Sequence, residues 1–360
     1  MVEFEYEDSK DLTASSNPKT FKTLVIIFSC FFLWLIAGVI LVKMAVRSSP
    51  AFLNIDPTIH AKLIGLESAG DELETVFVGS SRVHRQIDPF WIETSLVEKG
   101  CGTGSVYNLG VGGSSSSTTR FLLDYALRAR PEVDRLWVEP WGADQWSTRD
   151  SNINYALAPL WSYPIWNDRL SFKGDKKELI LAKLSTMSFL NYGMFHAMVE
   201  NFGAEPRFDQ IGFQGFQPLD ENLPFNHSRR KLYRKTVKNQ PNYFRDILIS
   251  AKRLLEQETS ASSDGLTNSI DIFLDGLTTK DLQRIGLILL PMQKYSQVTS
   301  DYVEIRGINI PIISTPIEKY DWLGNPENYI DRGHLNRKGA TRLSKAVAEQ
   351  ICKKTNIKKK

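Results

Sequence analysis

The stretch from Val76 to Arg82 reads Val-Phe-Val-Gly-Ser-Ser-Arg, a short apolar strand that runs directly into a Gly-Ser-Ser turn. Three consecutive β-branched or aromatic residues are typical of a strand that is buried on both faces. A helix-like segment at 89–99 and a second apolar strand at 105–109 follow. Strands that alternate with helices in this way indicate an α/β fold with a parallel sheet and helices on both faces.

The same alternation continues further along the chain. We expect strands at 135–138, 286–290 and 308–313, and helices at 118–130, 243–257, 278–284 and 337–352. In the last of these helices Leu343, Val347 and Ile351 recur every four residues, and Asn336 stands where an N-cap belongs. The sequence therefore predicts one α/β domain over 73–352, with an aromatic-rich insertion at about 143–241.

Composition limits the classes of function. The chain has 360 residues, of which 42% are hydrophobic and 24% charged, values that indicate a globular protein with a substantial core. The net charge of +3 gives no case for nucleic acid as a partner. Three scattered cysteines, Cys30, Cys101 and Cys352, are too few for a disulfide framework or a zinc site.

The N-terminal region predicts a membrane anchor. The segment 23–42 is almost wholly apolar and uncharged, and its roughly 20 residues match the length of a helix that crosses a bilayer. A cleaved signal peptide fits less well, because the preceding tail is long and no small-residue cleavage site follows. Basic residues on the two sides nearly balance, so charge does not fix the orientation. The expected segments are a cytoplasmic tail at 1–22, the transmembrane helix at 23–42, a connector at 43–72 and a basic tail at 353–360.

Two distant stretches carry residues for nucleophilic catalysis. The sites of parallel α/β sheets form at the carboxyl ends of the strands, where Ser81 is expected. The second stretch, Asp331-Arg332-Gly333-His334-Leu335-Asn336, offers His334 as the base that takes the serine proton and Asp331 as the carboxylate that orients the imidazole. Ser80 is the alternative nucleophile.

Other residues near these strand ends are candidates for binding. The backbone amides of Ser81 and Gly113 are candidate oxyanion donors. Arg82 either holds a substrate carboxylate or phosphate, or pairs with an acid such as Asp88. In and just before the insertion, Trp141 and Trp146 either stack on sugar rings or pack a small lid. The basic run at 229–238 is either a solvated helix face or a surface for anionic polymer or lipid headgroups.

Three of these motifs resemble blocks one, two and five of the SGNH (GDSL-like) hydrolase superfamily: Gly79 with Ser81, Asn108-Leu109-Gly110-Val111-Gly112-Gly113, and Asp331-x-x-His334-Leu335-Asn336. The resemblance covers about 73–142 and 283–352. It implies a three-layer α/β/α fold and ester chemistry, with Ser81 as nucleophile, Asp331 and His334 completing the triad, and Gly113 as an oxyanion donor.

The third block departs from the family pattern. Many members have Gly-x-Asn-Asp there, whereas this chain has Val138-Glu139-Pro140-Trp141-Gly142-Ala143-Asp144. Either another donor replaces the missing asparagine, such as Asn108 or a group from the insertion, or the oxyanion hole is weaker. Loss of one such donor typically costs about 100- to 1000-fold in rate.

With its predicted anchor, the chain most resembles bacterial SGNH proteins that modify cell-surface polymers. The resemblance implies a single-pass protein of the cytoplasmic membrane with a periplasmic domain. That domain would act without metal or cofactor as a serine esterase or O-acyltransferase on an acylated carbohydrate polymer. The alternative is a non-catalytic scaffold that binds a multi-span membrane acyltransferase.

Overall fold

The computed structural model describes residues 18–48, 57–140 except 103 and 115, 205, 207–219, 224–261, and 264–357 except 293. Its centre is a sheet with the strand order β2-β1-β3-β4-β6-β5. The strands are β1 (Leu73–Gly79), β2 (Ser105–Gly110), β3 (Arg135–Val138), β4 (Ile285–Leu289), β5 (Tyr302–Ile305) and β6 (Ile308–Ser314). All neighbours pair in parallel except β5, which is antiparallel to β6. The expected α/β class with a mainly parallel sheet is confirmed.

The side chains of the sheet feed two separate apolar cores. Successive residues of a strand point to opposite faces, so Val76 and Val78 lie in one core and Phe77 in the other. The two cores bury both faces of nearly every strand. This burial accounts for the continuous apolar runs in the sequence.

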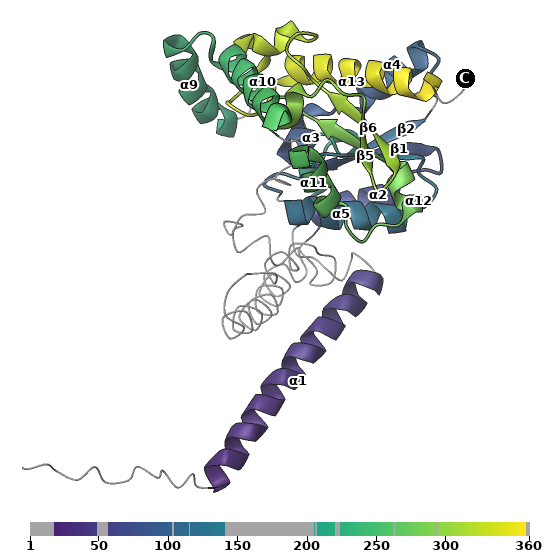
Figure 1. The fold of residues 1–360 in the computed structure, drawn as a ribbon, viewed down its shortest axis with the longest axis vertical. Coiled ribbons are helices and arrows are strands. Elements are labelled where there is room, and N and C mark those ends of the chain that lie inside the picture. Colours follow the sequence, from purple (N-terminus) through teal and green to yellow (C-terminus); the bar gives the residue numbers. More distant parts are fainter. Residues whose placement is uncertain are drawn as a thin grey trace, which may run out of the picture.

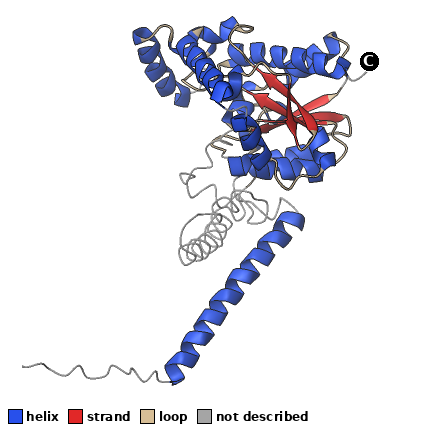
Figure 2. Cartoon of the chain, viewed as in Figure 1, coloured by secondary structure: helices blue, strands red, loops and turns tan. Residues whose placement is uncertain are grey.

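Helices cover both faces of the sheet (Figures 1 and 2). The first core receives side chains from α2 (Pro57–Glu67), α5 (Ser116–Ala129), α11 (Asp264–Phe273) and α12 (Thr279–Arg284). The second receives them from α3 (Ser81–Gln86), α4 (Pro89–Glu98), α9 (Pro224–Asn239), α10 (Tyr243–Ala261) and α13 (Arg337–Ile357). Short 3-10 turns lie at Phe208–Gln210, Phe213–Gly215, Lys294–Gln297, Asp321–Gly324 and Pro326–Asn328.

The elements that the sequence analysis missed include α3, α11 and β5. Helix α3 has only six residues, too few to show a helical period. Helix α11 is rich in small and polar residues. Strand β5 forms a hairpin with β6 through Arg306 and Gly307, whose φ angles of 52° and 75° suit a two-residue hairpin turn. Arg-Gly is a weaker signal for such a turn than Asn-Gly, because arginine rarely adopts positive φ.

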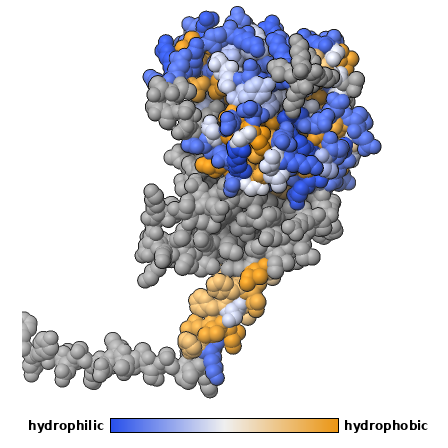
Figure 3. Space-filling view, turned by 45° about the vertical axis from the view of Figure 1, so that its right-hand side comes forward, coloured by the Kyte–Doolittle hydropathy of each residue, from blue (hydrophilic) through white to orange (hydrophobic). Residues whose placement is uncertain are grey.

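Helix α1 (Pro18–Ser48) covers the segment predicted to cross a membrane. Its described side chains are exposed and largely apolar, as Figure 3 shows. Across the described residues, no helix meets the combined length and hydropathy expected of a membrane span. Residues 1–17 of the tail expected at 1–22, residues 49–56 of the connector and most of the insertion lie outside the described residues.

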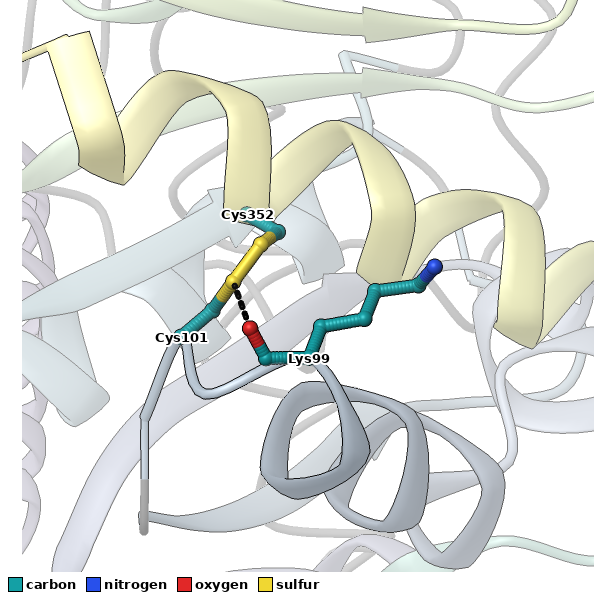
Figure 4. The surroundings of a disulfide bond; sticks show 3 residues. All are labelled: Lys99, Cys101 and Cys352. Carbon is teal, nitrogen blue, oxygen red and sulfur yellow. Dashed lines mark hydrogen bonds between the residues drawn. A yellow bond between two sulfur atoms is a disulfide. The ribbon is translucent and has the colours of Figure 1, made fainter.

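Two of the three scattered cysteines meet. Cys101, in the loop between α4 and β2, forms a disulfide with Cys352 of α13, with 5.3 Å between the Cα atoms and 251 residues between them in sequence (Figure 4). The Cys101 sulfur also lies 3.4 Å from the Lys99 carbonyl oxygen. Sequence spacing could not predict this pair, because only the packing of α13 against α4 brings the two cysteines together.

Replacing Cys352 with serine is expected to lower the free energy of unfolding by about 2–4 kcal/mol, because the bridge restricts a long loop in the unfolded chain. Urea unfolding of the full chain with and without reductant measures this. Wild type in reductant should match Cys352→Ser, and Cys30→Ser serves as the control with unchanged stability. Equal stability of wild type and Cys352→Ser would contradict the bridge.

Candidate active site

The two stretches singled out in the sequence come together at one edge of the sheet. The Ser81 hydroxyl oxygen lies 2.8 Å from His334 Nε2. On the other side of the ring, His334 Nδ1 lies 2.9 and 3.0 Å from the two carboxylate oxygens of Asp331. With its proton on Nδ1, the imidazole donates to Asp331 and accepts from the Ser81 hydroxyl, the arrangement of a Ser-His-Asp triad.

The loop that carries the base is held by its own backbone. Asp331 Oδ1 accepts the amides of Gly333 and His334 at 2.8 and 2.9 Å. The His334 carbonyl accepts the Ile330 amide, so the loop closes on itself. Beneath it, the rings of Phe244 and Tyr329 stack with centroids 3.9 Å apart. The hydrogen-bonded loop and the stacked rings therefore fix the orientation of the imidazole before any substrate binds.

The nucleophile lies at the start of α3. Val111 donates its amide to the Gly79 carbonyl at 3.0 Å, which keeps β2 beside β1 up to the turn. Ser80 is the N-cap residue of α3: its hydroxyl accepts the Arg82 amide at 3.2 Å, and the residue is 3% exposed. Ser81 is half-buried and faces His334. The geometry favours Ser81 over Ser80 as the candidate nucleophile, because the Ser81 hydroxyl contacts His334 whereas the Ser80 hydroxyl caps α3.

Glu139 is a part of the site that the sequence analysis missed. This residue follows β3, is completely buried, and accepts the Ser80 amide on Oε2 at 2.6 Å. A Cβ atom at Gly79 would lie 2.6 Å from the same oxygen, so the carboxylate occupies space that only glycine leaves open. In the sequence, Glu139 appeared only as one residue of the third block, which lacks the family's asparagine. An acidic residue directly after a buried strand was the signal that could have found it.

Arg82 lies between the two acids of the site. Burial lowers its pKa, while the negative charges of Glu139 and Asp331 oppose that change. Its Nη2 lies 4.0 Å from the position that a Cβ atom would take at Gly333, so the guanidinium adjoins the loop of the base. The acids whose charges act on Arg82 are Glu139 and Asp331, not the expected Asp88.

The pKa values of the two buried carboxylates shift in opposite directions. Burial raises the pKa of Glu139, against the influence of Arg82 and the hydrogen bond from Ser80. Burial would also raise the pKa of Asp331, but the hydrogen bond and charge of His334 and the amides of the loop outweigh it, and the pKa falls below 3.8. Asp331 is therefore ionised throughout the neutral range, as the partner of a catalytic histidine must be.

Asn108 holds the α3 segment rather than an oxyanion. Its side chain is fully buried and donates both amide hydrogens, to the carbonyls of Val83 and Ile87 at 2.7 and 2.6 Å. Its oxygen accepts the Gly110 amide at 2.9 Å. No N–H of this side chain remains for a substrate, so we remove Asn108 from the candidate oxyanion donors.

Gly113 follows β2 at the same edge of the sheet. It has a φ of 71°, is exposed, and has open space where a Cβ atom would stand. A glycine amide in such a turn suits close approach to a substrate. Trp141 and Trp146, the predicted substrate-stacking residues, lie outside the described residues.

A buried basic group packs behind the nucleophile. Lys62 is fully buried and donates to the carbonyls of Asn108, at 2.7 Å, and of Gly215. Burial, and then the charge of Arg85, holds its pKa well below 10.5. His84 is also buried, and burial likewise lowers its pKa. Both lie under the segment 207–219 and fix it to the sheet.

The chemistry available is that of acid–base and nucleophilic groups. In the part of the chain that is described, no cluster of histidine, cysteine and acidic side chains could hold a metal ion. Neither a protein-family model, nor a curated protein, nor a solved structure matches this chain.

Proposed function

We propose that the chain is a serine esterase or O-acyltransferase of the SGNH (GDSL-like) type. The observation that carries this proposal is the contact of 2.8 Å between the Ser81 hydroxyl and His334 Nε2, with Asp331 behind the ring. A serine hydroxyl is a poor nucleophile until a base removes its proton, and this geometry supplies the base. The parallel sheet with two helical faces agrees with the three-layer fold that the resemblance implies.

The proposed reaction has two steps. Ser81 Oγ attacks the acyl carbonyl while its proton moves to His334 Nε2, and the resulting oxyanion is stabilised by the amides of Ser81 and Gly113. Collapse breaks the ester bond, and the leaving alcohol takes the proton from His334. Water or a sugar hydroxyl then attacks the acyl-enzyme, with His334 again as base.

The proposed setting is the outer face of the cytoplasmic membrane. The exposed apolar side chains of α1 support a single-pass anchor. The Cys101–Cys352 bridge supports an oxidising compartment, because disulfides persist outside the cytosol. An acyl ester on a cell-envelope or exported carbohydrate polymer is the proposed substrate.

Trapping the acyl-enzyme tests the proposal. The full chain in detergent is mixed with p-nitrophenyl acetate and stopped in acid, and its peptides are then analysed by mass spectrometry. We expect one acetyl group on the peptide that contains Ser81. An unmodified Ser81 peptide after rapid quenching, together with no release of nitrophenol, would refute the reaction.

The second candidate function is a non-catalytic scaffold for a membrane acyltransferase. It is favoured by the third block, Val138 to Asp144, which lacks the family's oxyanion asparagine. Complementation separates the two functions. If a Ser81→Ala, His334→Ala double variant restores polymer acylation in a deletion strain as well as wild type does, the scaffold is correct.

The lowered pKa of Asp331 predicts how stability depends on pH. A carboxylate whose folded pKa lies below its unfolded value stabilises the fold above the unfolded value, here 3.8, and loses that contribution as the pH falls toward the folded pKa. Wild type should thus be more stable than Asp331→Asn at neutral pH, and the difference should shrink below pH 3.8. Urea unfolding of both proteins across this range measures it; a difference that stays constant would contradict the pKa direction.

A further inference from the structure

Helix α9 carries an unusual distribution of charge. Its 16 residues include six lysines and arginines and no acidic residue. Four of the cations, Lys231, Arg234, Lys235 and Lys238, recur at the spacing that places side chains on one face of a helix, and all four are exposed. We call these four residues the cationic stripe.

The cationic stripe has no acidic counterpart in the described part of the chain. The ion pairs recorded there include none of its four side chains. Like charges four residues apart, as in Lys231 with Lys235 and Arg234 with Lys238, destabilise a helix. Alternating acidic and basic residues would keep the helix soluble without this repulsion. The cationic stripe therefore lowers the stability of α9.

The opposite side of α9 is fixed to the loop that carries the base. Arg230 donates to the Tyr329 carbonyl at 3.1 Å, and Arg332 donates to the Thr236 hydroxyl at 3.1 Å. Arg229 lies 3.5 Å from Asp331 Oδ2 and is half exposed. The helix is therefore a rigid neighbour of the triad, and Figure 1 shows it beside α10 at one end of the molecule.

Positive charge continues from α9 onto the helix of the nucleophile. Burial, together with repulsion from Arg229, lowers the pKa of Arg85 to about 10. The two guanidinium groups are thus near each other, although they belong to different helices. Arg85 donates to the backbone and side chain of Gln217. Arg85 and Arg229 therefore extend positive charge to the side of α9 that faces the base, whereas the stripe covers the side that faces away from it.

We infer that the cations on these two sides of α9 bind the anionic groups of a carbohydrate polymer whose acyl ester lies at Ser81. The inference rests on the proposed function and adds the substrate class: a chain with carboxylate, phosphate or sulfate groups at intervals, rather than a neutral glycan. Charges that are spaced along a rigid helix beside the nucleophile suit a repeating anion better than a single small ion. The polymer would lie along α9 and present successive esters to the triad.

Binding of a model polyanion tests the inference. The probe is unesterified polygalacturonate, with dextran as the neutral comparison, titrated into the full chain in detergent with Ser81→Ala to prevent turnover. We expect polygalacturonate to bind, dextran not to bind, and affinity to fall with added salt. Neutralising the stripe with four Lys or Arg→Gln changes should weaken binding by about tenfold or more, since each exposed ion pair contributes modestly.

A matched control removes four exposed charges elsewhere, on Lys99, Arg128, Lys280 and Lys353. Binding should survive in this variant; equal weakening in both would mean a nonspecific charge effect and would overturn the inference. Unchanged binding in the stripe variant would overturn it too. The inference would also be overturned if neutralising the stripe weakened binding to phosphatidylglycerol vesicles but not to polygalacturonate, because that result would assign α9 to the membrane.

Two further measurements separate this inference from the proposed function. Without the Ser81→Ala change, the stripe variant should still hydrolyse p-nitrophenyl acetate at the wild-type rate, and it should be at least as stable, because repulsion is relieved. If wild type binds polygalacturonate through the stripe but releases no nitrophenol, the ester chemistry fails while the binding surface stands. If stripe neutralisation lowers hydrolysis of the small neutral ester as well, α9 supports the triad itself and the polymer role is refuted.

Discussion

Replacing Ser81 with alanine is expected to abolish covalent labelling by a fluorophosphonate and to lower esterase turnover by about 10⁴-fold or more. The reason is specific: the only hydroxyl placed at 2.8 Å from His334 Nε2 in the described structure is that of Ser81. Its removal leaves the imidazole without a nucleophile to activate. Labelling is followed by in-gel fluorescence, and turnover by nitrophenol release.

Ser80→Ala is the matched control for this change. It removes a neighbouring hydroxyl that caps α3, so we expect a loss of about 1 kcal/mol in stability while labelling persists. His334→Ala should lose labelling as Ser81→Ala does. Equal labelling of wild type and Ser81→Ala would remove Ser81 from the mechanism, and labelling lost only in Ser80→Ala would make Ser80 the nucleophile.

Replacing Glu139 with alanine is expected to cost about 3–5 kcal/mol of stability, because the change leaves a buried amide without its acceptor and the partly buried Arg82 guanidinium without one of its two acids. The carboxylate is fully buried, accepts the Ser80 amide at 2.6 Å and faces the charge of Arg82. Urea unfolding of the full chain gives the stability. The rate of fluorophosphonate labelling below the transition reports whether the nucleophile turn is still in place.

Glu139→Gln distinguishes the hydrogen bond from the charge. Its side chain has nearly the same shape, and its oxygen can still accept the Ser80 amide, so we expect most of the stability and labelling rate to return. Stability equal to that of Glu139→Ala would show instead that the charge opposite Arg82 matters most. A Glu139→Ala protein as stable as wild type would contradict the buried contact itself.

Much of the sheet could be predicted because its strands are buried on both sides. Val76, Phe77 and Val78 form an apolar run that has no other simple interpretation, and the repeated alternation with helices then implies parallel pairing. Strand β5 was missed because only one of its faces is buried, and it is four residues long. The disulfide was missed because the pairing of Cys101 with Cys352 depends on tertiary packing alone.

The part of the candidate site that could be predicted consists of residue types with a specific chemical role in catalysis. A serine nucleophile needs a base. The serine at a strand end and the Asp-x-x-His before a helix could therefore be expected to lie close together. Asn108 and Glu139 show the limit. The sequence shows that both are polar residues near strand ends. Whether such a side chain faces the substrate or the interior depends on tertiary packing. The structure gives both of them inward hydrogen bonds.

The distance along the chain between Ser81 and His334 also affects synthesis. A ribosome that has made the β1–α3 segment has produced the serine, but the imidazole comes 253 residues later. During that interval the nascent polypeptide has no activated hydroxyl and cannot form an acyl adduct. Contacts between such remote segments also slow folding, since a long loop must close before they form. In the proposed mechanism, the chain therefore gains its activated serine only after the helix that follows His334 has docked.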